Sequence, residues 1–118
     1  MLSGVVCILT GASEGIGDAV AKMLAMETGA NLVMASRQLA LLEEKCRQFC
    51  ADGQTRERFL AVKCDIAKEE EVAEMVKRTM ERYGRIDVLI NCAGLMYYTM
   101  AKKGYTPVGI FGEIEIQK

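Results

Sequence analysis

The chain has 118 residues, which is enough for one domain and not for two. Its 15 basic and 16 acidic residues give a net charge of −1, which argues against nucleic acid or an anionic membrane as the main partner. It contains no histidine, and this excludes imidazole acid–base chemistry and histidine-ligated metal sites.

The cysteines and the apolar run at the N-terminus indicate the cellular compartment. No CxxC pair occurs among the five cysteines, and Cys46 and Cys50 share a helix face without a further ligand cluster, so we expect reduced, buried thiols and no metal site. The first residues lack a basic segment and their apolar run ends at Leu9, which predicts neither a signal peptide nor a membrane span. These features favour the cytoplasm.

Short apolar runs alternate with helical periods from the start of the chain. Val5–Leu9 predicts a strand, and a glycine-rich loop follows it. Apolar residues at helical spacing then predict a helix that ends at Gly29. Its expected buried stripe consists of Ile16, Ala19, Val20, Met23, Leu24 and Met26. Asn31–Ala35 is the second predicted strand.

The same alternation continues to residue 91. A helix whose apolar face includes Leu39, Leu42, Cys46 and Phe49 ends at Asp52–Gly53, and Phe59–Cys64 is the third strand. A helix over 68–83 has an apolar face of Val72, Met75, Val76, Met80 and Tyr83. Ile86–Asn91, apolar at its centre, is the fourth strand. This order predicts a parallel α/β sheet with right-handed crossovers.

The pattern changes after Gly94. Residues 101–118 carry the only proline and no helical period, and "EIEI" near the end alternates like an edge strand. We therefore expect an α/β domain over residues 1–100 and a divergent tail over 101–118.

The loop "LTGASEGIG" (residues 9–17) places Gly11, Gly15 and Gly17 between a predicted strand and a predicted helix. Free amides and the positive end of a helix dipole would meet there, and glycines let the backbone approach an anion, so the arrangement favours phosphate binding. A tight turn without a ligand is the alternative.

Three motifs resemble the short-chain dehydrogenase/reductase family in their order and placement: "TGASEGIG" (Thr10–Gly17), "CDI" (Cys64–Ile66) and "NCAG" (Asn91–Gly94), in which Cys92 replaces the family's second asparagine. The resemblance covers residues 3 to about 100. It implies a Rossmann-like three-layer fold whose parallel sheet has about four strands in the order 3-2-1-4, with an incomplete second half.

The resemblance also implies which residues contact a dinucleotide cofactor. The pyrophosphate would be wrapped by Gly11, Ser13, Gly15, Ile16 and Gly17. The adenine would contact Asp65 and Ile66. The fourth strand and the ribose would be flanked by Asn91, Ala93 and Gly94.

The end of the second predicted strand bears on the choice of cofactor. A NAD-specific fold places an acidic residue here, whereas this chain has Ser36 and Arg37, which suit the 2′-phosphate of NADP. The alternative is that Arg37 is a solvated surface residue. Glu14 stands where many NADP-using relatives carry a basic residue.

The family's catalytic serine, tyrosine and lysine arrive after the fifth and later strands, so we expect the chain to stop before them. Tyr98 and Lys102 have the Y-x-x-x-K spacing of the catalytic pair but come too early, and we interpret the match as accidental. The predicted function is therefore the NADP(H)-binding part of an oxidoreductase that transfers hydride between the nicotinamide and an alcohol or carbonyl.

Two alternatives stay open at this stage: a non-catalytic nucleotide-binding or interaction module, and a truncated gene product. Without a fifth strand, the fourth strand would expose an apolar edge, through which two chains could pair.

Overall fold

The computed structural model describes residues 2–92. The predictions for Ala93, Gly94, Tyr98, Lys102 and the tail over 101–118 lie outside these residues. The described strands are β1 (Val6–Thr10), β2 (Asn31–Ser36), β3 (Phe59–Lys63) and β4 (Val88–Asn91). The described helices are α1 (Gly15–Glu27), α2 (Leu39–Ala51) and α3 (Glu69–Tyr83), with the 3-10 turn η1 at Arg56–Arg58.

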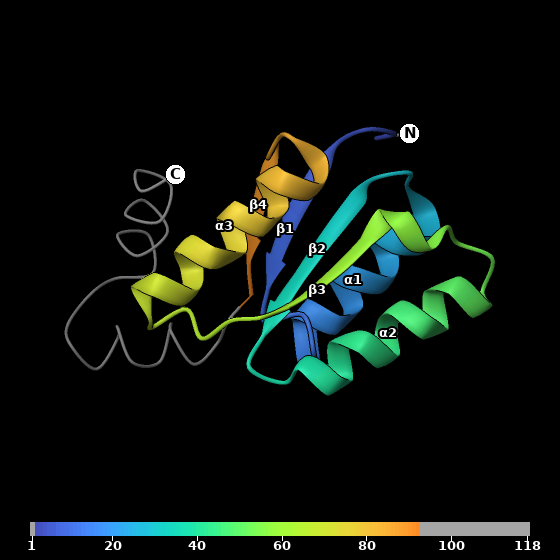
Figure 1. Ribbon diagram of the computed structural model, residues 1–118. Helices are drawn as coiled ribbons and strands as arrows, with labels where there is room; N and C mark the ends of the chain where they lie inside the picture. The colour runs from blue at the N-terminus through green and yellow to red at the C-terminus, as the bar shows by residue number, and fades with distance from the viewer. Residues whose placement is uncertain (1, 93–118) are drawn as a thin grey trace.

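The four strands form one parallel sheet in the order β3-β2-β1-β4, as predicted. Helices α1 and α2 lie on one face of this sheet and α3 lies on the other (Figure 1). The arrangement is a three-layer Rossmann-like fold, which confirms the predicted fold class.

The two central strands are apolar along their length because helices cover both of their faces. Alternate residues point to opposite faces. Leu9 and Leu32 pack with α1 and α2, whereas Ile8 and Val33 pack with Met75 of α3. The sheet is thus held between two separate apolar clusters, and this rigid centre positions the loops at its ends.

The buried face of helix α1 overlaps the predicted stripe only in part. Its buried residues are Gly17, Ala21, Leu24 and Ala25. Ile16 is 77% exposed, and Met23 and Met26 are 45% and 43% exposed. Of the predicted stripe, Leu24 is buried and Val20 packs half-buried against the core cluster. Periodicity therefore located the buried face only in part, because it gave no weight to the small residues that face the sheet and the loop.

The end of α1 lies close to the predicted one, since the helix stops at Glu27, Thr28 is its C-cap residue and Gly29 follows. Side chains of Thr28 and Arg58 satisfy carbonyl groups at this end. The Arg58 guanidinium donates hydrogen bonds to the carbonyl oxygens of Leu24, Ala25, Thr28 and Ala30 at 2.8–3.3 Å. This contact joins η1 to α1 and caps the negative end of the helix dipole.

On the other face, α3 buries Met75 and Thr79, whereas Val76 and Met80 are 39% and 45% exposed. The predicted apolar face of α3 is therefore only partly covered by the described residues. In the same part of the chain, no helix is long and apolar enough to cross a membrane. The five cysteines form no disulfide in the described residues; three of them are buried, as predicted, whereas Cys50 and Cys92 are half-buried.

Candidate functional site

The carboxyl ends of the parallel strands lie at one edge of the sheet. Thr10 at the end of β1 is in register with Ala35 of β2 and with Asn91 of β4, and Ser36 is in register with Lys63 of β3. The chain after β1 passes to β2 on one side, whereas β4 lies on the other side, so the order reverses at β1. Ligands of open α/β sheets bind at such a switch point.

The glycine loop between β1 and α1 has a backbone that other residues would strain or block. Gly11 and Gly15 have φ values of +67° and +62°, in the left-handed region. A Cβ added at Gly17 would lie 1.8 Å from the carbonyl oxygen of Gly11. The first turn of α1 is thereby pressed against the loop, which is the close approach that a phosphate cradle requires.

The start of α1 offers backbone amides to this loop. Its N-cap residue, Glu14, is extended at φ −157° and makes no capping hydrogen bond with its side chain. Because the first amides of a helix have no partner within the helix, and the dipole is positive there, an anion is favoured at this point. The residues present therefore fit a pyrophosphate group.

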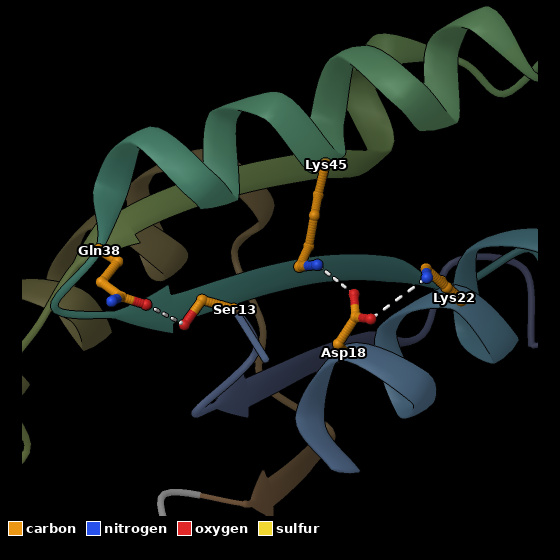
Figure 2. A network of polar contacts seen from close by, with 5 residues as sticks. All are labelled: Ser13, Asp18, Lys22, Gln38 and Lys45. Carbon is orange, nitrogen blue, oxygen red and sulfur yellow. Dashed lines mark hydrogen bonds and ion pairs between the residues drawn. The ribbon is translucent and has the colours of Figure 1, made fainter. Parts of the chain in front are cut away.

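Polar contacts link the loop and α1 to α2 (Figure 2). The Ser13 hydroxyl donates to Oε1 of Gln38 at 3.1 Å, and the backbone N–H of Gln38 donates to Oγ of Ser36 at 3.0 Å. Lys45 of α2 pairs with the Asp18 carboxylate, and the hydrogen bond from Lys45 is the main cause that lowers the pKa of Asp18.

Arg37 follows β2 and is exposed. Among the described residues its guanidinium forms no hydrogen bond or ion pair, in contrast to Arg47, Arg58 and Arg85. The end of β2 contacts the glycine loop, where the N–H of Ala12 donates to the Ala35 carbonyl oxygen at 3.4 Å. A guanidinium that follows this strand end, with its donors available, suits a phosphate group.

Asp65 and Ile66 follow β3 at the same edge of the sheet. The Asp65 carboxylate accepts a hydrogen bond from the backbone N–H of Ala67 at 3.0 Å, while the N–H of Asp65 donates to Glu71 at 2.9 Å. Ile66 is half-buried against the cluster beneath α3. Burial raises the pKa of the preceding Cys64 to about 11, so this thiol is protonated at neutral pH.

Asn91 ends β4 beside the glycine loop. Its Oδ1 accepts a hydrogen bond of 2.6 Å from the hydroxyl of Thr10, which is 4% exposed. The N–H of Cys92 donates to the carbonyl oxygen of Thr10 at 3.2 Å. The fourth strand is thereby tied to the base of the loop, whereas Ala93 and Gly94 lie outside the described residues.

The structure thus places Gly11, Ser13, Gly15, Ile16 and Gly17 in one turn, with Ser36, Arg37, Asp65, Ile66 and Asn91 at the neighbouring strand ends. Sequence reasoning missed Gln38 and Lys45, because their partners are 25 and 27 residues away. It also assigned no role to Thr10, although a hydroxyl at the end of a buried strand signals a need for a partner.

A parallel sheet of this order, with a glycine loop that opens its first helix, defines a dinucleotide-binding domain of the Rossmann type. The chain belongs to the short chain dehydrogenase family, whose model matches residues 5–108. Members of this family are oxidoreductases that bind a nicotinamide dinucleotide.

Individual relatives agree with this assignment. Glycine betaine reductase ATRR from Emericella nidulans is 41% identical over 99 residues, which are 84% of this chain and 8% of that protein. The C-domain of a bacterial malonyl-CoA reductase with NADP is 30% identical with a TM-score of 0.72, over 78% of this chain and 15% of that one. The 3-ketoacyl-(acyl-carrier-protein) reductase from Brucella melitensis complexed with NADH is 32% identical with a TM-score of 0.65, over 75% and 34%. The chain spans about a third or less of the length of these three relatives.

Proposed function

We propose that residues 1–100 bind NADP(H) and form the cofactor-binding part of a short-chain oxidoreductase. The observation that carries the proposal is the exposed Arg37 at the end of β2, beside Ser36 and the glycine loop. In NAD-specific folds an acidic side chain at this place accepts hydrogen bonds from the ribose hydroxyls. An arginine cannot accept, but it donates to a 2′-phosphate.

Each part of the site has one task in this proposal. The loop amides and Gly17 hold the pyrophosphate, Ser36 and Arg37 hold the 2′-phosphate, and Asp65 and Ile66 flank the adenine. Bound NADPH would supply hydride to a carbonyl carbon, or NADP would accept it from an alcohol. The family's serine, tyrosine and lysine would handle the substrate's proton in a segment beyond the described residues.

Calorimetry with the full chain tests the cofactor assignment. A charge-assisted hydrogen bond contributes about 1.5–3 kcal/mol, so Arg37→Ala should reduce the preference for 2′,5′-ADP over 5′-AMP by roughly ten- to a hundredfold. Arg47→Ala is the matched control, because this exposed arginine is paired with Glu44 on α2 and should leave the preference unchanged. An unchanged preference in Arg37→Ala would remove the NADP assignment.

A non-catalytic nucleotide-binding module is the second candidate. Tyr98 and Lys102 have the spacing of the family's catalytic pair, but they come sooner after the fourth strand than that pair does, and this favours a module without catalysis. This candidate predicts similar, weak affinities for NADP and for 2′,5′-ADP, because the nicotinamide half would have few partners. Markedly tighter binding of the whole dinucleotide would contradict it, as would NADPH oxidation with a carbonyl substrate that is lost in Tyr98→Phe.

A further inference from the structure

Asp18 places a carboxylate in the first turn of α1, directly after the glycine loop. An acidic side chain here is attracted by the positive end of the helix dipole, as a bound phosphate would be. The carboxylate and the phosphate therefore compete for the same field, and they also repel each other across about one helical turn, ~5 Å along the axis. An uncompensated Asp18 would weaken anion binding at this loop.

Two lysines compensate this charge from different positions (Figure 2). Lys22 lies one turn along α1, 3.2 Å from the carboxylate, and its side chain is 59% exposed. Lys45 reaches across from α2, and its side chain is only 11% exposed, while that of Asp18 is 25% exposed. Because water and salt screen the exposed pair much more than the shielded one, Lys45 provides the persistent part of the compensation.

The shielded pair also sets where the Asp18 carboxylate lies. Lys45 and Lys22 both contact Asp18 on the α2 side of α1, and Ser13 is held on the same side by Gln38. The carboxylate is thus directed towards α2.

We propose, building on the phosphate-binding role of the loop, that Lys45 is a positioning residue for the cofactor pyrophosphate. It holds the Asp18 carboxylate towards α2 and neutralises it, so that the amides at the start of α1 remain available to a diphosphate. Lys45 acts through Asp18 and does not itself touch the ligand.

A double-mutant cycle with ADP as the probe tests this role. Lys45→Met roughly keeps the length of the side chain and leaves Asp18 paired only with the exposed Lys22, so the affinity for ADP should fall about three- to tenfold, and more at low salt than at high salt. Asp18→Asn/Lys45→Met removes both charges and should return the affinity to within about twofold of the parent chain. Lys22→Met is the matched control and should change the affinity less than twofold, because its charge is hydrated.

The pattern of ADP affinities among the variants separates a positioning role from simple support of the fold, and thermal unfolding of each variant checks that it is folded. A merely structural role predicts that Asp18→Asn weakens ADP binding as Lys45→Met does, and that the double variant is no better than either. That result, or an unchanged affinity in Lys45→Met, would overturn the inference. If the parent chain itself fails to bind ADP, the proposed function fails instead. If Arg37→Ala alters the 2′-phosphate preference while Lys45→Met leaves the ADP affinity unchanged, only the present inference fails.

Discussion

Replacing Gly17 with alanine tests the contact on which the glycine loop depends. The new Cβ would lie 1.8 Å from the Gly11 carbonyl oxygen, whereas real Cβ contacts are essentially never shorter than 3.0 Å, so the loop or α1 must shift. Overpacking of this kind costs about 1–3 kcal/mol, and the higher helix propensity of alanine returns about 1 kcal/mol. We expect a net loss of up to about 2 kcal/mol, which lowers the Tm by up to roughly 8–16 °C for a domain of this size.

The effect on ligand binding should exceed the effect on stability. The shift displaces the amides that would face the pyrophosphate, and such geometry is sensitive to displacements of about 1 Å, so we expect ADP to bind at least tenfold more weakly. Calorimetry gives the affinity, and circular dichroism gives the Tm. Gly53→Ala is the control, because Gly53 has φ +95° with open space around it and lies after α2. It should lose about 1 kcal/mol of stability and keep its affinity for ADP.

One result would refute this reasoning directly. If Gly17→Ala keeps both the Tm and the ADP affinity of the parent chain, the first turn of α1 does not press on Gly11, and the loop is not the cradle that its glycines suggest. A loss of ADP binding in Gly53→Ala equal to that in Gly17→Ala would instead attribute the effect to stability.

Three further expectations concern stability and reactivity. Arg58→Ala should destabilise the chain by about 2–4 kcal/mol in urea unfolding, because it removes the donor to carbonyl oxygens in the last turn of α1 and directly after it, and Arg58→Lys should restore only part of this loss. The pKa of Asp87 is lowered, first by the hydrogen bond from Arg85 and then by that from the Val6 N–H. Ionised Asp87 therefore stabilises the fold above the unfolded-state pKa of about 4, and this contribution is lost as the pH falls below that value. Asp87→Asn should flatten the curve of unfolding free energy against pH in this acid range. At pH 8, iodoacetamide should label the half-buried Cys50 before Cys64, whose pKa is about 11, and equal labelling rates would contradict the burial of Cys64.

The two central strands could be predicted from the sequence because helices cover both of their faces. Apolar runs without alternation, such as "VVCIL", distinguish buried parallel strands from the polar loops around them. The shorter apolar run of β4 also predicted a strand, although Val88 is 38% exposed and the rest of β4 is only half-buried among the described residues. The observed strands begin and end within two residues of the predicted ones. The motif residues also lie together as predicted, since the carboxyl ends of parallel strands share one edge.

The packing of α1 could not be predicted in the same way. Periodicity gives weight to large residues such as Ile16 and Met23, whereas α1 also buries small residues. Of these, Gly17 lies against the loop, and Ala21 and Ala25 are fully buried. Lys45, Gln38 and Arg58 escaped prediction for a related reason. Each acts on a partner at least 25 residues away, and no local pattern encodes such a contact.

The pKa shifts at the site favour anion binding over proton transfer. A general acid or base works best with a pKa near the operating pH. At or beside the carboxyl edge of the sheet, three groups have pKa values shifted away from neutrality: Lys45 is the chief cause that lowers the pKa of Asp18, and burial raises the pKa of Cys92 and raises that of Cys64 to about 11. None of these shifts moves a proton donor or acceptor towards pH 7, whereas an ionised Asp18 and protonated thiols are compatible with holding an anion. We therefore expect the described residues to provide the cofactor's binding energy, and a group beyond them to provide the proton.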